Sequence, residues 1–373
     1  MKLAGWKKRI RLDIDYTNKI GGSVTQFPVT IFLKPTNGDT WKVFNEVGNN
    51  YRKIAITKAD GVTELKVEME LWDVANKVGI LHTSLANWVI GGDTSIYLYY
   101  DGSHYDNPNV GNIASTAGQA VWDSNFKMVQ HLIDYDTSHT KDSTSNNNDG
   151  TKKAANEPIE ADGKIGKAQS FDGKDDYINL GRPSSLNLTS AWTLEAWVKP
   201  TSSPNGSGII TEAFSGDNIV QYELGFGMDA ARPLRLMTGF FQSGAGWSLA
   251  EDSVDISTNQ WTHIIGTWDG TTLRVYKNGA SVGSNVPGRS SKAGSESFWI
   301  GRRHDTYTSA SFFPGLIDEV RISNVARSSA WIKASYNSLN DTLIKYLKEE
   351  TLFSRRGIFY VPINTSNFFH FFR

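Results

Sequence analysis

The chain has 373 residues, of which 39% are hydrophobic and 21% charged, a composition typical of globular proteins and not of disordered ones. Its formal net charge of -1 provides no overall field to attract nucleic acid or an anionic membrane. We therefore expect no nucleic-acid partner. The chain contains no cysteine, so we expect no disulfides. No apolar run approaches the roughly 20 residues of a membrane span, so we expect no membrane insertion.

The first part of the chain has the period-two alternation of half-buried β-strands. In residues 9–16, Ile10, Leu12, Ile14 and Tyr16 would share one face, with charged residues on the other. Further runs lie at residues 27–33, 53–57, 64–72 and 95–100, separated by Gly and Asn clusters that indicate turns. We predict an N-terminal β-sandwich that, with an Asn-, Gly- and Pro-rich linker, occupies residues 1–119.

The second part, residues 120–339, has many short strands and little helical periodicity. The Asn278-Gly279 dipeptide is a strong hairpin signal. Two stacked antiparallel sheets, a jelly roll, account for the strand count, so the fold class is all-β with two sandwich domains. Residues 328–337 are predicted to form a short helix. The strands are expected at residues 126–132, 168–171, 177–180, 192–198, 208–214, 221–226, 234–238, 261–268, 272–277, 298–301 and 315–322.

After Asn340 the pattern breaks, and residues 340–373 are predicted as a C-terminal tail. Residues 346–350 could form a helical turn and residues 357–364 an edge strand. Four Phe in the last six residues would form a costly exposed apolar patch on a monomer. The tail would therefore pack either against a partner subunit, making it an assembly element, or against the chain's own domain.

Four segments carry a family resemblance: residues 168–181 (AQSFDGKDDYINLG), 192–200 (WTLEAWVKP), 261–279 and 313–323. In order and spacing they resemble the concanavalin A-like lectin/glucanase domains of laminin-G type, over about residues 120–339. Residues 6–10, 27–31, 96–100 and 121–126 resemble an uncharacterised domain family that often precedes such domains in bacterial surface and phage proteins. That second resemblance implies no chemistry.

Two acidic loops, residues 142–150 and 317–320, suit Ca²⁺, which takes six to eight oxygen ligands. In laminin-G-like relatives a metal often lies where two such segments meet. The resemblance therefore implies a structural Ca²⁺ ion with Asp142, Asn147 and Asp318 as ligands. The alternative is that these carboxylates organise turns. A third cluster, Asp172, Asp175 and Asp176, is expected to be a solvated hairpin turn, with metal binding as the alternative.

A sugar-binding rim is predicted around residues 301–307. Aromatic rings pack on pyranose faces, and Arg binds carboxylated or sulfated sugars in a bidentate manner. The candidate ligand-binding residues are Trp247, Arg302, Arg303, His304 and Tyr307. Alternatively, these aromatic residues close the edges of the sandwich or form subunit contacts.

No catalytic motif is found, and we expect no enzymatic activity. The Glu-x-Asp-x-x-Glu pattern of the glucanase branch is absent, as are metal-binding histidine pairs and nucleophile elbows. We therefore expect a non-enzymatic adhesion or virion protein, such as a capsid decoration or tail-fibre component, that binds a glycan or a neighbouring subunit. The absent signal segment and the apolar tail favour the virion. The alternative is a secreted or cell-surface bacterial carbohydrate-binding module, and a glycan hydrolase ranks third.

Overall fold

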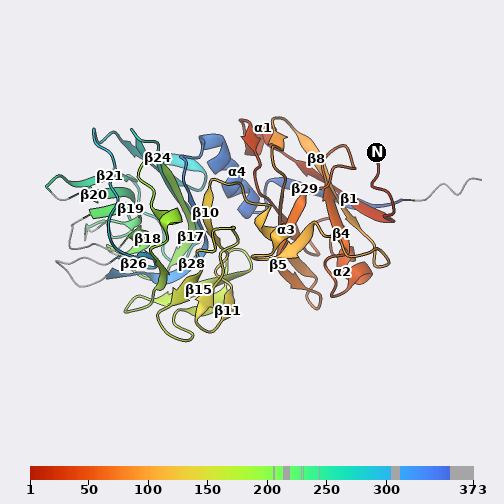
Figure 1. Cartoon of the computed structure of the whole chain (residues 1–373), viewed down its shortest axis with the longest axis horizontal. Coiled ribbons are helices and arrows are strands. Elements are labelled where there is room, and N and C mark those ends of the chain that lie inside the picture. The colour runs from red at the N-terminus through yellow and green to blue at the C-terminus, as the bar shows by residue number, and fades with distance from the viewer. Residues whose placement is uncertain are drawn as a thin grey trace, which may run out of the picture.

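Two β-sandwiches lie side by side in this computed structural model (Figure 1). The structure describes residues 1–204, 206–212, 219–227, 229, 231–242, 244–303 and 311–352. Within these ranges no helix is long and apolar enough to cross a membrane. The fold is therefore the predicted all-β class with two sandwiches.

The N-terminal sandwich consists of two four-stranded sheets around one apolar core. Alternate residues of the first strand, Ile10, Leu12 and Ile14, are buried in that core, as the alternation predicted. The first sheet has the order β29 (Ile344–Thr351), β1 (Lys8–Ile14), β8 (Thr94–Tyr100) and β4 (Ile54–Thr57). The second has the order β3 (Val29–Leu33), β6 (Val78–Ser84), β5 (Lys66–Asp73) and β9 (Val110–Asn112), and a short pair is formed by β2 (Val24–Thr25) and β7 (Val89–Ile90).

The jelly roll contains an eight-stranded and a nine-stranded sheet, with a second apolar core between them. The first sheet has the order β14 (Ile159–Asp162), β15 (Lys167–Asp172), β28 (Pro314–Ser323), β17 (Trp192–Pro200), β22 (Thr262–Trp268), β23 (Leu273–Lys277) and β24 (Ala280–Asn285), with β10 (Phe126–Gln130) also paired to β28. The second has the order β11 (Asp134–Asp136), β12 (His139–Thr140), β13 (Gly150–Lys152), β16 (Ile178–Gly181), β25 (Phe298–Ile300), β18 (Gly208–Glu212), β19 (Ile219–Phe226), β20 (Leu236–Gln242) and β21 (Gly246–Glu251). A two-stranded pair, β26 (Arg302–Arg303) and β27 (Ser311–Phe312), follows β25.

The helices are short, and the longest is the one predicted. It begins after Ser328, whose hydroxyl accepts a hydrogen bond from the Trp331 N–H (3.2 Å), an ordinary N-cap. Trp331 and Ala334 of this helix are buried in the N-terminal core, so the helix joins the two sandwiches. The helices are α1 (Tyr16–Lys19), α2 (Lys42–Val47), α3 (Thr116–Gln119), the 3₁₀ turn η1 (Ser184–Leu186) and α4 (Ser329–Leu339).

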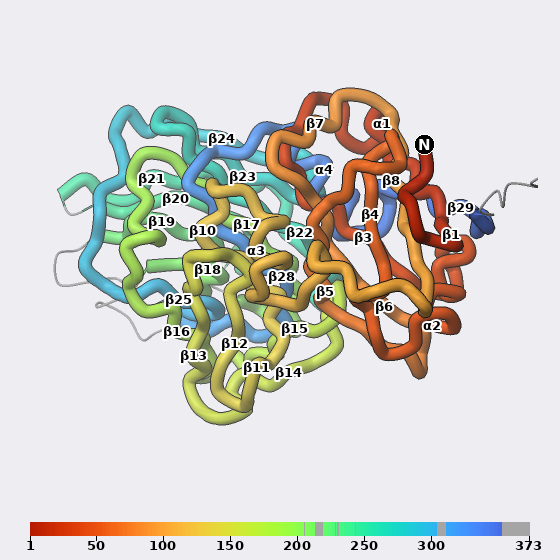
Figure 2. Tube along the Cα trace, turned by 45° about the vertical axis from the view of Figure 1, so that its right-hand side comes forward, coloured from red at the N-terminus to blue at the C-terminus, as the bar shows by residue number. Residues whose placement is uncertain are grey.

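The chain returns to the first sandwich after α4, which differs from the expected tail. Residues 344–351 form β29 and pair with β1, whereas a helical turn was predicted at residues 346–350. Figure 2 shows this late strand beside β1. The side chains of Leu343 and Ile344 are buried in the N-terminal core. Residues 353–373, which include the Phe-rich end, lie outside the described residues.

Candidate functional site

Arg302 stacks on aromatic rings at the outer face of the nine-stranded sheet. In β25, Phe298 and Ile300 point into the core, so Trp299 between them points outward. The guanidinium carbon of Arg302 lies 4.0 Å from the Trp299 ring centroid. It lies 5.0 Å from the Tyr177 ring and 5.4 Å from the Phe312 ring. We call Tyr177, Trp299, Arg302 and Phe312 the arginine–aromatic surface.

The charge of Arg302 has no neutralising partner in this surface. The side chain is half-buried, and burial lowers the pKa of its guanidinium. No carboxylate pairs with it among the described residues, and its Nε has no hydrogen-bond partner there. A cation held against aromatic rings is stabilised by their quadrupoles, yet keeps its N–H groups as donors.

Arg303 contacts a different set of side chains, and its role is structural. Its Nε donates to Glu223 Oε1 at 2.7 Å, and both side chains are buried. The guanidinium carbon lies 5.4 Å from the ring of Trp247, which packs on Phe241. The structure therefore divides the predicted rim: Arg303 lies with Trp247, whereas Arg302 lies with Trp299. Two other predicted residues, His304 and Tyr307, lie outside the described residues.

The predicted calcium ligands form hydrogen bonds within the protein. Both carboxylate oxygens of Asp142 are already hydrogen-bonded by the N–H groups of Val129, Thr144 and Asn148 and by the Thr144 hydroxyl, at 2.8–2.9 Å. These donors occupy the lone pairs that a cation would need, so Asp142 organises its loop. Asn147 is exposed and turned to Ser145 and Gln119.

Asp318, the third predicted ligand, binds a different segment. Its Oδ2 accepts from the Ile165 N–H at 2.9 Å. The three predicted ligands, Asp142, Asn147 and Asp318, therefore fit Ca²⁺ poorly. The alternative, that the carboxylate organises a turn, describes Asp142 better. The other acidic cluster is also a turn, in which Asp172 accepts from the Lys174 N–H and Asp176 from the Asp172 N–H, both at 2.8 Å.

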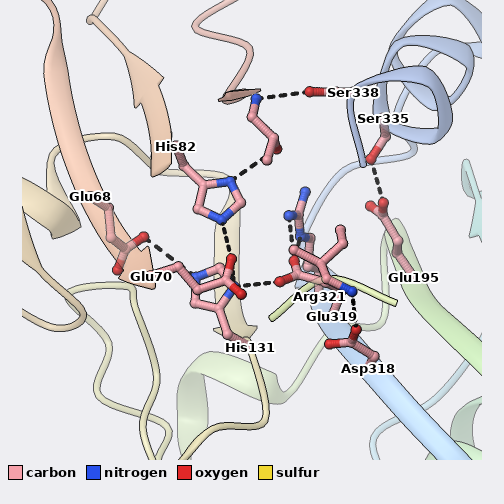
Figure 3. A network of polar contacts seen from close by, with 12 residues as sticks. Glu68, Glu70, His82, His131, Glu195, Asp318, Glu319, Arg321, Ser335 and Ser338 are labelled. Atoms are coloured by element: carbon pink, nitrogen blue, oxygen red, sulfur yellow. Dashed lines mark hydrogen bonds and ion pairs between the residues drawn. The ribbon is translucent and has the colours of Figure 1, made fainter. Parts of the chain in front are cut away.

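A buried polar network between the two sandwiches was missed by the sequence analysis (Figure 3). Glu68 and Glu70 come from β5 and His82 from β6, while His131 follows β10 and Glu319 lies in β28. All five side chains are buried. The spacing of these positions along the chain matches no metal-binding or catalytic motif, so no local sequence signal could have identified them.

A bulge in β28 aims two acidic residues at this junction. Ile317 and Val320 point into the jelly-roll core, and the register with β17 shifts between them. Glu319 has a φ of 51°, in the left-handed region. Asp318 and Glu319 therefore both face the N-terminal sandwich, whereas a regular strand would have sent them to opposite faces.

Hydrogen bonds and burial set the protonation of the network. His82 Nε2 lies 2.8 Å from Glu70 Oε2, and His131 Nδ1 lies 2.5 Å from Glu319 Oε1. Burial lowers the pKa of His82 to about 3 and raises the pKa of Glu70 to about 8. Burial opposes the charge of His131, but Glu319 and Glu70 raise its pKa well above the ordinary value.

Beside this network, Glu195 of β17 pairs with His263 of β22. The His263 Nε2 lies 2.9 Å from Glu195 Oε1, and the Ser335 hydroxyl of α4 donates to the same oxygen. Burial opposes ionisation of Glu195, but these donors, His263 first, hold its pKa below the ordinary value. Because His263 lies on the adjacent strand, no motif around Glu195 in the sequence could have identified this pair.

Residues 172–333 match the family model described as the concanavalin A-like lectin/glucanases superfamily. Among solved structures, the chain is similar to domain 4 of an extracellular arabinanase from Geobacillus stearothermophilus in complex with arabinotriose. The identity is 25% and the TM-score 0.45, covering 57% of this chain and 98% of that one.

The chain is also similar to the binding domain of Paraclostridial Mosquitocidal Protein 1, at 17% identity and a TM-score of 0.44, with 57% of this chain and 52% of that one covered. A third similar structure is the native heptameric SAP-like pentraxin from Limulus polyphemus, at 18% identity and a TM-score of 0.31, with 39% and 69% covered. No curated protein matches the chain. Residues 172–333 thus match the concanavalin A-like lectin/glucanase family model, and the two stacked sheets agree with that match.

Proposed function

We propose that this is a non-enzymatic binding protein whose concanavalin A-like domain binds glycans carrying carboxylate or sulfate groups. The binding site would be the arginine–aromatic surface. The observation that carries this proposal is Arg302, a half-buried guanidinium stacked on Trp299 with no carboxylate partner among the described residues.

The chemistry of the surface suits an acidic sugar. Tyr177, Trp299 and Phe312 are each partly exposed, so their rings can pack against the C–H faces of a pyranose. The guanidinium is planar and can donate two parallel hydrogen bonds to a carboxylate or sulfate. Aromatic rings would supply the affinity for a sugar ring, and Arg302 the preference for a charged one.

The non-enzymatic part of the proposal is supported by the carboxylates of the same sheet. Glu223 is bound by Arg303, and Glu212 accepts from the Gln221 N–H at 2.7 Å and lies 3.6 Å from Arg182. A retaining glycosidase needs one free carboxylate nucleophile and one protonated acid about 5–5.5 Å apart. A carboxylate paired with an arginine is poorly suited to act as the nucleophile or as the protonated acid.

An extracellular or cell-surface location agrees with a glycan-binding role and is part of the proposal. The role in a virion, as a decoration or tail-fibre component, stays a prediction. It rested in part on an apolar tail whose residues 353–373 are outside the described ranges. Oligomerisation through that tail is likewise a prediction.

The proposal is tested on an array of neutral, uronic-acid-containing and sulfated oligosaccharides. We expect the protein to bind the acidic ones, with affinity falling as salt rises. Losing one charge-assisted contact of about 1.5–3 kcal/mol should weaken binding roughly 10- to 100-fold in Arg302→Gln. Trp299→Ala should also weaken it.

A matched control is Arg274→Gln, because Arg274 is a partly exposed arginine of the other sheet, paired with Asp269. It should bind like the wild type. The proposal fails if no acidic glycan is bound, or if Arg302→Gln and Arg274→Gln behave alike. Binding of neutral glycans alone would reject the role assigned to Arg302.

A further inference from the structure

We propose that the junction between the two sandwiches binds one divalent transition-metal ion, with Zn²⁺ as the best fit, through Glu70, His82, His131 and Glu319. This site is separate from the arginine–aromatic surface and does not depend on the glycan proposal. Two imidazoles and two carboxylates are a ligand set that Zn²⁺ accepts in closed, four-coordinate sites.

The four side chains converge on one small volume. Each offers one ligand atom, and these four atoms all lie within 4.8 Å of one another. His131 Nδ1 lies 3.5 Å from Glu70 Oε2, and His82 Nε2 lies 2.8 Å from the same oxygen. With zinc–ligand bonds of about 2.0–2.1 Å, ligand atoms of a tetrahedral site lie about 3.3 Å apart. The observed spacings run from 2.5 Å, between His131 Nδ1 and Glu319 Oε1, to at most 4.8 Å, and so bracket this value.

Outer partners orient three of the four ligands, which is the usual arrangement around a protein-bound metal. Thr30 Oγ1 lies 3.0 Å from His82 Nδ1, so that nitrogen can carry the proton and leave Nε2 as the ligand atom. Glu68 Oε2 lies 3.6 Å from His131 Nε2 and is itself held by the Trp122 indole N–H at 2.6 Å. Arg321 donates to the second oxygen of Glu319 at 2.5 Å.

An unpartnered buried atom points to a missing ligand. Glu70 Oε1 has no hydrogen-bond partner among the described residues, although its side chain is nine-tenths or more buried. Such orphaned polar atoms are rare in folded proteins. Figure 3 shows the two imidazoles and the carboxylates of Glu70 and Glu319 facing one another.

The charge at the junction also favours a dication. With a metal bound, Glu70 and Glu319 would carry two negative charges and the two imidazoles none. In the outer shell, Glu68 and Arg321 cancel each other. An isolated buried charge is costly, so this pair of charges needs either two protons or one divalent cation. The ion would hold both sandwiches in one arrangement, because β5 and β6 supply two ligands and the jelly roll supplies Glu319.

The test measures metal in the full-length protein after refolding in Zn²⁺ and dialysis, since a buried site loads most readily during folding. Elemental analysis should find one Zn²⁺ per chain. His82→Gln and Glu319→Gln should lose this metal. Glu68→Gln, which changes only an outer partner, should weaken Zn²⁺ binding about 10- to 100-fold.

Two control variants, Asp175→Asn and His139→Gln, should keep the metal, because the first changes the exposed acidic turn and the second an exposed histidine outside the junction. If the ligand variants do not fold, the absorption spectrum of the wild type loaded with Co²⁺ tests the site. An intense four-coordinate Co²⁺ spectrum supports the site, whereas a weak six-coordinate one overturns it. Sub-stoichiometric Zn²⁺ in the wild type, or full retention by His82→Gln, also overturns it.

Discussion

Deleting β29 should unfold the N-terminal sandwich, although this strand lies more than 200 residues after the rest of that domain. A chain ending at Leu339 would lose one of the two strands paired with β1 and the buried side chains of Leu343, Ile344 and Leu352. At about 1.5–3 kcal/mol for each buried large apolar residue, the loss is roughly 5–9 kcal/mol. Whole-domain stabilities are about 5–15 kcal/mol, so little would remain.

Tyr346 adds a link between the two sheets of that sandwich. Its hydroxyl accepts from the Phe32 N–H and donates to Asp341, both at 2.9 Å. The deletion would also expose the edge of β1, which invites aggregation.

The assay is urea denaturation followed by far-ultraviolet circular dichroism, with light scattering to detect association. The matched control is a chain ending at Leu352, which keeps β29 and removes only residues 353–373. We expect the control to retain the unfolding transition of the full chain and the shorter chain to lose that of one domain. Equal midpoints and amplitudes for the two truncations would refute the assignment of β29 to the N-terminal core. The same pair of truncations tests the predicted assembly role of the tail, since only the control removes it without damaging the fold.

Three further predictions concern single residues. Arg327→Met should cost about 3–5 kcal/mol in urea denaturation, because it leaves Asp123, bound in bidentate fashion at 2.6 and 2.7 Å, buried without its partner; a loss below 1 kcal/mol would contradict this. Gly301→Ala should cost about 1–3 kcal/mol more than Gly288→Ala, because both glycines have positive φ but only at Gly301 would a Cβ overlap a phenylalanine ring; equal losses would show that backbone strain alone matters. Burial opposes ionisation of Glu195, but its donors hold its pKa below 4.5. The contribution of Glu195 to stability is therefore present above pH 4.5 and lost as pH falls through the lowered pKa. Glu195→Gln should flatten the acid limb of a plot of stability against pH, and an unchanged acid limb would count against the pairing.

The strands could be predicted because their sequences alternate, but the surroundings of the strands could not. In β5, alternation predicted that the glutamates face away from the N-terminal core, and they do. Yet Glu68 is fully buried, because the jelly roll covers that face. The strand β6, which carries His82, was not predicted at all, since it lacks a clear alternating pattern.

The candidate site was predicted in part. Arg302 was chosen for its residue type and neighbours, but its aromatic partner Trp299 was not among the chosen residues. Arg303 was chosen for the same reason and proved to be a buried partner of Glu223. The two arginines are held by different side chains, so the run Arg302-Arg303 does not act as one patch.

By itself, the sequence determined the all-β class, the two sandwiches, the resemblance to lectin-like domains and a helix, predicted at residues 328–337 and found at 329–339. Period-two alternation, turn residues and local motifs are encoded over short distances. Only the tertiary structure decided that β29 completes the first sandwich, that a bulge turns Asp318 and Glu319 to one side, and that Glu70, His82, His131 and Glu319 meet. These features arise from contacts between segments tens to hundreds of residues apart. They depend on how distant segments and the two domains pack together, which no local sequence pattern predicts.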